Sequence, residues 1–373
     1  MEQVYNFDEF SMPMWIRFLF GGLYLVVVVY TIWKTLVIAP KNKQAVTVSS
    51  LFVLYFTAFA IFYCINSDYF SYRDWMQLSL IDIVYWNKEQ VYAYLIWFCR
   101  TQEIDYPFEL FRLIIWGGAL LLVLITAKMY KSLLMPGLVM LFLFVFYSGT
   151  FCYARASLAM AVYFMGVAII MCGDNFFVKI LGIALAGCSY FFHHELIIGI
   201  AALPGLIVPF EKKKTIFITL IMLAVMIVAI TYINSHLSLL ETIMGDDDIS
   251  QKMEAYNERE QGLFRVSTFI SYFNIYYPFI LISVFFYRDK HIPKPIAGMY
   301  RIMLILLMTT IAFMIVEGMR STYVYRILYI NIIPMSFLIA YCYNQGYFKK
   351  RQFIIMLMLA CLTNCMRLIQ AVY

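Results

Sequence analysis

Long apolar runs separated by short polar segments recur along the whole chain. Twelve of these runs approach the roughly 20 residues that an α-helix needs to cross the hydrocarbon core of a membrane. They lie near 16–38, 46–65, 109–127, 133–150, 154–172, 176–192, 195–210, 215–234, 264–287, 297–317, 326–345 and 353–372. The pattern predicts an all-α polytopic membrane protein with about 12 transmembrane helices, in a single domain over residues 1–373.

Basic residues orient these helices, because Lys and Arg accumulate in cytoplasmic loops. With Met1 outside, the inner loops contain sixteen of the 28 Lys and Arg residues, but only Asp174, Glu211 and Asp289 among the 22 acidic residues. The inner basic residues are Lys34, Lys41, Lys43, Lys128, Lys131, Lys179, Lys212, Lys213, Lys214, Arg288, Lys290, Lys294, Arg301, Lys349, Lys350 and Arg351. We therefore predict that both termini lie on the outer side.

Two outer segments, 66–108 and 235–263, are longer than tight connections. We expect them to be extracytoplasmic loops that cover an outward-facing groove. Within the first loop, Val91–Cys99 is too short to cross a membrane and predicts an interfacial helix. The second loop contains the consecutive carboxylates of 246–248, which lack the alternating spacing of an EF-hand and favour a solvated loop.

The apolar stretch 176–210 is interrupted in its middle by His193-His194-Glu195. A single span would put Lys179 and the basic cluster 212–214 on opposite sides, against the charge asymmetry, so we predict a hairpin. Its arms have about 16–17 residues each, or roughly 25 Å, which is short of a full crossing. The histidine pair is therefore expected slightly below the outer headgroups.

Composition supports the membrane class. Hydrophobic residues make up 64% of the chain, charged residues 13%, and the mean hydropathy is +0.80, all outside the range of soluble globular domains. The N-terminus lacks the features of a cleaved signal peptide, so we expect the first helix to be retained. The eight cysteines show no CxxC spacing and are interpreted as small core residues. We expect no nucleic-acid partner.

Ionisable residues at membrane depth are costly and are functional candidates by default. A single arginine near a helix end is also typical of an anchor at the interface, and a single aspartate of a helix cap. Several arginines on one side match the oxygens of a diphosphate. The candidates share a predicted position at the outer ends of spans, and they are Asp68, Arg112, Arg155, His193, His194, Arg265, Arg320 and Arg326. The other two histidines, at 236 and 291, do not extend the pair into a metal site, so we expect no metal and no cofactor.

Aromatic residues crowd the first outer loop. Their ordinary use is the interfacial belt and helix packing. Their rings are also candidates for stacking on sugar rings, and they are Tyr69, Tyr72, Tyr85, Trp86, Tyr92, Tyr94 and Trp97.

The order of these motifs resembles the EpsG-like branch of bacterial Wzy-type polysaccharide polymerases over nearly the whole chain. The resemblance rests on 67–72, on Glu89 before an aromatic stretch, on 155–161, on Phe192-His193 and on Arg326-Ile327. It maps the family's aspartate to Asp68, its arginine opening the middle helix to Arg155, its histidine to His193 and its late arginine to Arg326. The family's small residue two places after the histidine is Glu195 here, so His193 alone and the group 193–195 are both candidates for facing the substrate.

The resemblance implies an enzyme of the bacterial cytoplasmic membrane with its active face outside. It would be a metal-independent glycosyltransferase that uses polyprenyl-diphosphate-linked oligosaccharides as donor and acceptor, with a chain-length regulator as a candidate partner. The arginines Arg155, Arg326, Arg265 and Arg320 would stabilise the departing diphosphate. His193 or Asp68 would take the acceptor proton. Tyr69, Tyr72, His194 and Glu195 are the candidate sugar contacts.

Three other classes stay open. An O-antigen-ligase-like transferase would use the same donor with another acceptor. A membrane O-acyltransferase would also use a histidine, but has less use for outer arginines. A flippase would need polar residues lining a path at mid-depth, whereas the middles of the predicted helices carry almost no charge.

Overall fold

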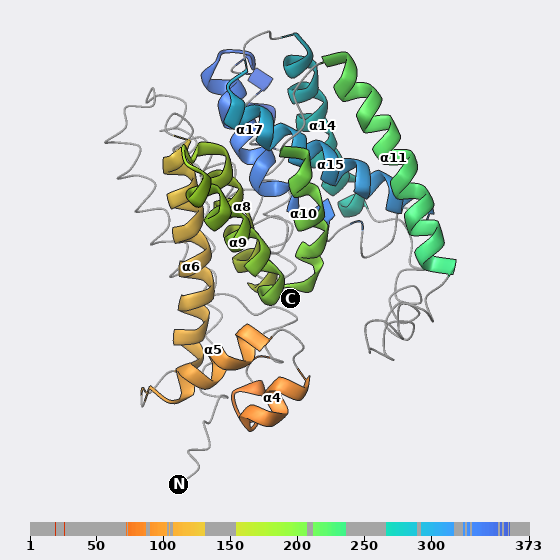
Figure 1. Cartoon of the computed structure of the whole chain (residues 1–373). Coiled ribbons are helices and arrows are strands. Elements are labelled where there is room, and N and C mark those ends of the chain that lie inside the picture. Colours follow the sequence, from red (N-terminus) through yellow and green to blue (C-terminus); the bar gives the residue numbers. More distant parts are fainter. Residues whose placement is uncertain are drawn as a thin grey trace.

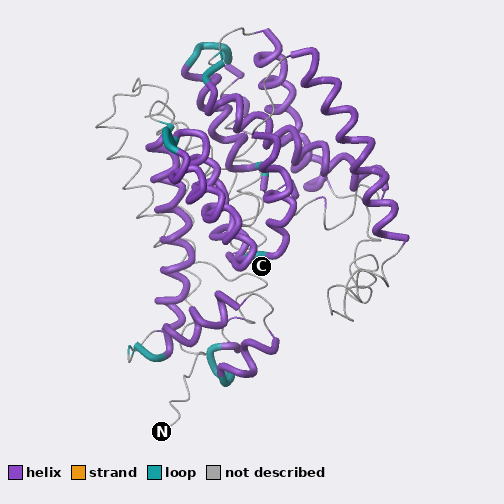
Figure 2. The backbone as a smooth tube through the Cα atoms, in the orientation of Figure 1, coloured by secondary structure: helices purple, strands orange, loops and turns teal. Residues whose placement is uncertain are grey.

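The structure is a computed structural model. It describes residues 19, 26, 72, 74–86, 90–102, 104, 107–130, 154–206, 212–235, 266–288, 292–316, 324, 327–328, 330–349, 351–352, 354–356 and 358. Within these ranges all regular structure is helical and no strand occurs (Figure 2). This confirms the predicted all-α class for the described part of the chain.

The main elements are arranged as shown in Figure 1. The α-helices are α4 (Leu80–Trp86), α5 (Gln90–Arg100), α6 (Pro107–Met129), α8 (Ala154–Cys172), α9 (Phe176–Phe192), α10 (Ile197–Ala202), α11 (Lys212–Ser235), α14 (Val266–Arg288), α15 (Lys294–Val316) and α17 (Ile332–Asn344). Two 3₁₀-helices, η3 (His194–Leu196) and η4 (Leu203–Leu206), flank α10.

Three helices of the described chain are long and apolar enough to cross a membrane. They are Pro107–Met129, Arg155–Cys172 and Lys294–Val316, and each lies on a predicted span. The protein is therefore an integral membrane protein. The predicted spans 46–65 and 133–150 lie outside the described residues, as do most of 16–38 and 353–372. The total of 12 spans and the outward-facing groove stay predictions.

Helices α8 and α9 form an antiparallel pair closed by a short turn. The turn is set locally, because the Asn175 side chain accepts a hydrogen bond from the Val178 N–H (2.7 Å) and caps α9. Close approach of the two helices requires glycine. A Cβ on Gly166 would lie 2.6 Å from both the Gly182 carbonyl oxygen and the Ala186 nitrogen, and small residues commonly line such membrane-helix contacts.

We expect Gly182→Ala to destabilise this pair. The added Cβ would lie 2.8 Å from the Gly166 carbonyl oxygen and 2.9 Å from the Ile170 nitrogen, and a backbone cannot move aside as a side chain can. Overpacking typically costs about 1–3 kcal/mol. The apparent Tm in detergent, followed by intrinsic fluorescence, should fall. Gly187→Ala is the matched control, because Gly187 lies on the same helix with nothing within 4 Å of its Cβ position. Equal Tm values for the two variants would contradict this packing.

The predicted break at His193–Glu195 is confirmed, but the second arm differs from the prediction. α9 ends at Phe192, and His193 takes an extended conformation before η3 begins. The predicted span 195–210 is not one continuous α-helix, since six residues of α10 lie between two 3₁₀-helices. Pro204 lacks an N–H donor, and Gly205 approaches Ile305 so closely that a Cβ would meet its Cδ1. Together these residues interrupt regular α-helix.

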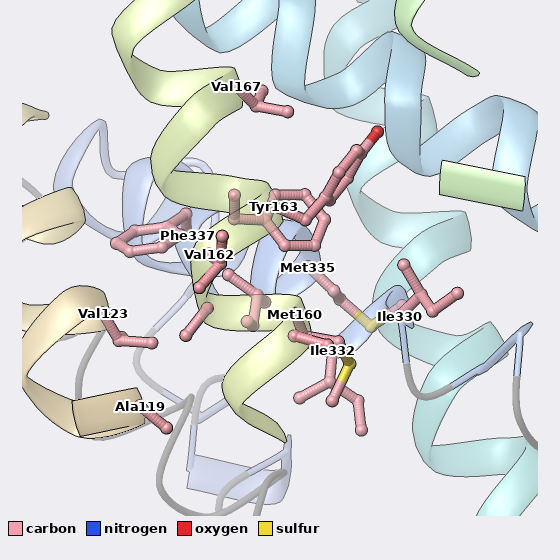
Figure 3. Close-up of a cluster of buried hydrophobic side chains, with 14 of the residues drawn as sticks. Ala119, Val123, Met160, Val162, Tyr163, Val167, Ile330, Ile332, Met335 and Phe337 are labelled. Atoms are coloured by element: carbon pink, nitrogen blue, oxygen red, sulfur yellow. The ribbon is translucent and has the colours of Figure 1, made fainter. Parts of the chain in front are cut away.

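The predicted span 326–345 is also interrupted. α17 begins only at Ile332, and the Asn331 N–H instead bonds to the Leu328 carbonyl (3.1 Å), three residues back. Pro334 explains the interruption, because its ring and missing N–H disfavour a helix continuing past the carbonyl of residue 330. Side chains on both sides of this point pack against Met160 and Tyr163 of α8 (Figure 3).

α15 is the central helix of the described bundle and is buried on nearly all sides. It contacts α8, α10, α11 and α17. The hydroxyls of Thr309 and Thr310 donate to the carbonyls of Ile305 (3.0 Å) and Leu306 (2.9 Å), so these buried polar groups are satisfied within the helix. α11 lies at the edge of the bundle and contacts mainly α15 (Figure 1).

Segment 66–108, the predicted first outer loop, contains two helices in its described part, where the sequence predicted one. The predicted helix is α5, and the short helix α4 precedes it. α5 buries the face formed by Tyr92, Ala93, Ile96 and Cys99 beside the N-terminal end of α6 (Figure 1). Burial raises the pKa of the Cys99 thiol to about 11, so this cysteine stays protonated and unreactive near neutral pH. That agrees with its interpretation as a packing residue.

Candidate functional site

Arg155 lies in the first turn of α8, and helix α5 holds its backbone. The Tyr92 hydroxyl donates a hydrogen bond to the Arg155 carbonyl oxygen at 2.7 Å. Tyr92 is fully buried, so this bond is shielded from competing water. The start of α8 is therefore tied to α5.

The Arg155 side chain lies beside two aromatic rings. Its guanidinium carbon lies 5.6 Å from the centre of the Tyr72 ring and 5.8 Å from that of Trp75. Both distances are within the range of a cation–π interaction. Tyr72 contacts Trp75 edge-on (5.1 Å) and the Phe111 ring of α6 (5.4 Å). The rings of Tyr72 and Trp75, the aromatic pair, thus join Arg155 to α6 through Phe111.

His193 occupies the turn after α9. Its own N–H donates to the Ser189 carbonyl (3.0 Å), and its Nδ1 accepts the Glu195 N–H (3.4 Å). The Nε2 atom lies 3.9 Å from the Glu195 carboxylate, and the two side chains are 14% and 20% exposed. A carboxylate at this distance stabilises the positive charge that the imidazole gains on accepting a proton.

His194 points into different surroundings. Its ring stacks on Tyr190 of α9, with 4.7 Å between ring centres and 27° between planes. The two adjacent histidines are thus held by different partners, and it is His193 that lies beside the carboxylate.

The antiparallel pairing of α8 and α9 brings the start of α8 and the end of α9 to the same end of the bundle. Arg155 and His193, 38 residues apart in the sequence, therefore share this end. Tyr92 contacts both neighbourhoods, because its ring also meets Phe192 edge-on at 6.2 Å. This arrangement of Arg155, His193, Glu195, Tyr92 and the aromatic pair is named the outer-end site, because the sequence predicts that its charged residues lie at the outer ends of spans.

Not every predicted site residue can be placed. Asp68, Tyr69, Arg265, Arg320 and Arg326 lie outside the described residues. Tyr72 is placed with 4% of its surface exposed, in contact with Arg155. Arg112 is also buried, and its guanidinium lies 5.8 Å from the Phe108 ring.

Sequence reasoning missed Trp75 and did not single out Tyr92 from the other loop aromatics. For Tyr92 a signal existed, since residues 92, 96 and 99 repeat at helical spacing and predict one buried face. No comparable pattern marks Trp75. Among the described residues, no three His, Cys, Asp or Glu side chains cluster as a metal site requires. Metal independence stays a prediction.

The spanning helices and the charged groups at one end of the bundle define a multi-pass membrane protein. Comparison with protein families identifies the family. The model of the EpsG family matches residues 16–372, so the chain belongs to the EpsG family. The predicted resemblance is confirmed, and family membership assigns a polysaccharide-polymerase-like role in the membrane. Comparisons with curated proteins and with solved structures found no match.

Proposed function

We propose that this protein joins polyprenyl-diphosphate-linked oligosaccharide units into a surface polysaccharide on the outer face of the bacterial cytoplasmic membrane. The observation that carries the proposal is the outer-end site. It presents an arginine beside two aromatic rings and a histidine beside a carboxylate at the same end of an EpsG-family bundle.

The reaction follows from these groups. A hydroxyl of the acceptor sugar attacks the anomeric carbon of the donor glycan. The bond from that carbon to the diphosphate oxygen breaks, and polyprenyl diphosphate leaves. Arg155 stabilises the charge that grows on the leaving diphosphate, together with Arg326, Arg265 and Arg320. His193 takes the proton of the attacking hydroxyl on Nδ1, which gives up its 3.4 Å hydrogen bond from the Glu195 N–H, and Asp68 is the alternative base.

Reconstitution tests this proposal. The purified protein is placed in proteoliposomes with a polyprenyl-diphosphate-linked repeat unit, and products are resolved by size. A ladder of products spaced by one repeat unit, with release of polyprenyl diphosphate, is the expected result, and added chelator should not change it. Transfer only to a chemically different acceptor would indicate a ligase instead. Movement of the unit across the bilayer without joining would indicate a flippase.

A further inference from the structure

Tyr92 makes two contacts that together bridge the outer-end site. Its hydroxyl donates to the Arg155 carbonyl (2.7 Å), and its ring meets the edge of Phe192, the residue before His193 (6.2 Å). Tyr92 belongs to α5, a helix of the outer loop, whereas Arg155 and His193 belong to the ends of α8 and α9.

The hydrogen bond from Tyr92 to the Arg155 carbonyl is made in addition to the regular hydrogen bonds of the helix. In a regular helix this carbonyl accepts the N–H four residues on, and a carbonyl oxygen has two lone pairs. The Tyr92 hydroxyl supplies a second donor, which fixes the first turn of α8 against α5. The side chain of the same arginine is held independently, by the aromatic pair.

We infer that Tyr92 is a positioning residue that sets Arg155 relative to His193, so that leaving-group stabilisation and proton removal act on one bound substrate. The inference rests on the proposed function. Its physical basis is that catalytic groups must be held close to productive geometry, since small displacements are costly in rate. A residue contacting both neighbourhoods is placed to fix their separation.

The test replaces only the hydroxyl. Tyr92→Phe keeps the ring on Phe192 and removes the bond to Arg155. A matched control exists on α8: Tyr163 is equally buried, and its hydroxyl donates to the Gly199 carbonyl at 2.5 Å. Tyr163→Phe therefore removes a buried tyrosine–carbonyl bond of the same kind, from a residue that does not contact Arg155.

Two measurements are compared for each variant. The first is kcat and KM for the lipid-linked repeat unit. The second is the affinity for polyprenyl diphosphate, measured without any acceptor. We expect Tyr92→Phe to lower kcat about 3- to 10-fold and to weaken diphosphate affinity by a similar factor, because one hydrogen bond is lost. KM should change less than twofold. Both variants should lower the Tm alike, but Tyr163→Phe should leave kcat and affinity at wild-type values.

A second arm tests whether Tyr92 acts through Arg155. In an Arg155→Lys background, the forked guanidinium is gone, and Tyr92→Phe should then cost clearly less than in the wild type. If Tyr92→Phe matches Tyr163→Phe in kcat and affinity while the wild type polymerises, the positioning role is overturned and the proposed function stands. If the wild type binds polyprenyl diphosphate but makes no polymer, the proposed function fails. The effect of Tyr92 on Arg155 is then tested only by the affinities of the variants for polyprenyl diphosphate.

Discussion

Chain extension is expected to stop when His193 is replaced by glutamine. Glutamine approximates the volume of histidine and keeps a hydrogen-bonding amide near the position of Nε2, which lies 3.9 Å from the Glu195 carboxylate. It cannot accept a proton near neutral pH. General-base catalysis contributes roughly 10²–10⁴-fold, so the rate of polymer formation in proteoliposomes should fall by that order. Donor binding should survive, because the arginines are unchanged.

The control for this variant is His194→Gln, one residue along the same turn. The His194 ring stacks on Tyr190 rather than facing a carboxylate, so a much smaller loss is expected. Protein abundance and Tm should be close to wild type for both variants. A His193→Gln protein that polymerises at near the wild-type rate would exclude His193 as the base, and Asp68 would be tested next.

Arg155→Lys is expected to show the second large effect. Lysine keeps the positive charge but loses the planar fork that binds two phosphate oxygens at once. It also loses the contacts that the guanidinium makes with the rings of Tyr72 and Trp75. The loss of polymerisation rate should approach the roughly 10²-fold typical of removing one donor to a developing negative charge. The rate is measured from the release of polyprenyl diphosphate in the reconstituted assay.

Arg351→Lys serves as the comparison, because Arg351 is exposed and is predicted to lie on the inner side of the membrane. It should polymerise at the wild-type rate. Unchanged polymer length and yield in Arg155→Lys would reassign Arg155 to anchoring the end of α8 at the membrane interface.

The extent of the helices could be read from the sequence. The predicted spans 154–172 and 176–192 coincide with α8 and α9, and the spans 109–127, 215–234, 264–287 and 297–317 agree with α6, α11, α14 and α15 within a few residues. Apolar runs determine helices in a membrane because every backbone group must be satisfied within its own segment. The same pattern did not show where 195–210 and 326–345 are interrupted, since proline and glycine in such runs are also compatible with continuous helices.

The sequence by itself determined the membrane class, the family and which charged residues stand at predicted helix ends. It could not determine their partners, because contacts between distant segments depend on how the helices pack. Only the tertiary structure placed Tyr72 and Trp75 beside Arg155 and showed that Tyr92 contacts Arg155 and Phe192, the residue before His193. The contact that holds α8 and α9 together is their close approach at Gly166 and Gly182. Hydropathy does not reveal this contact, because glycine can stand at any position of an apolar run.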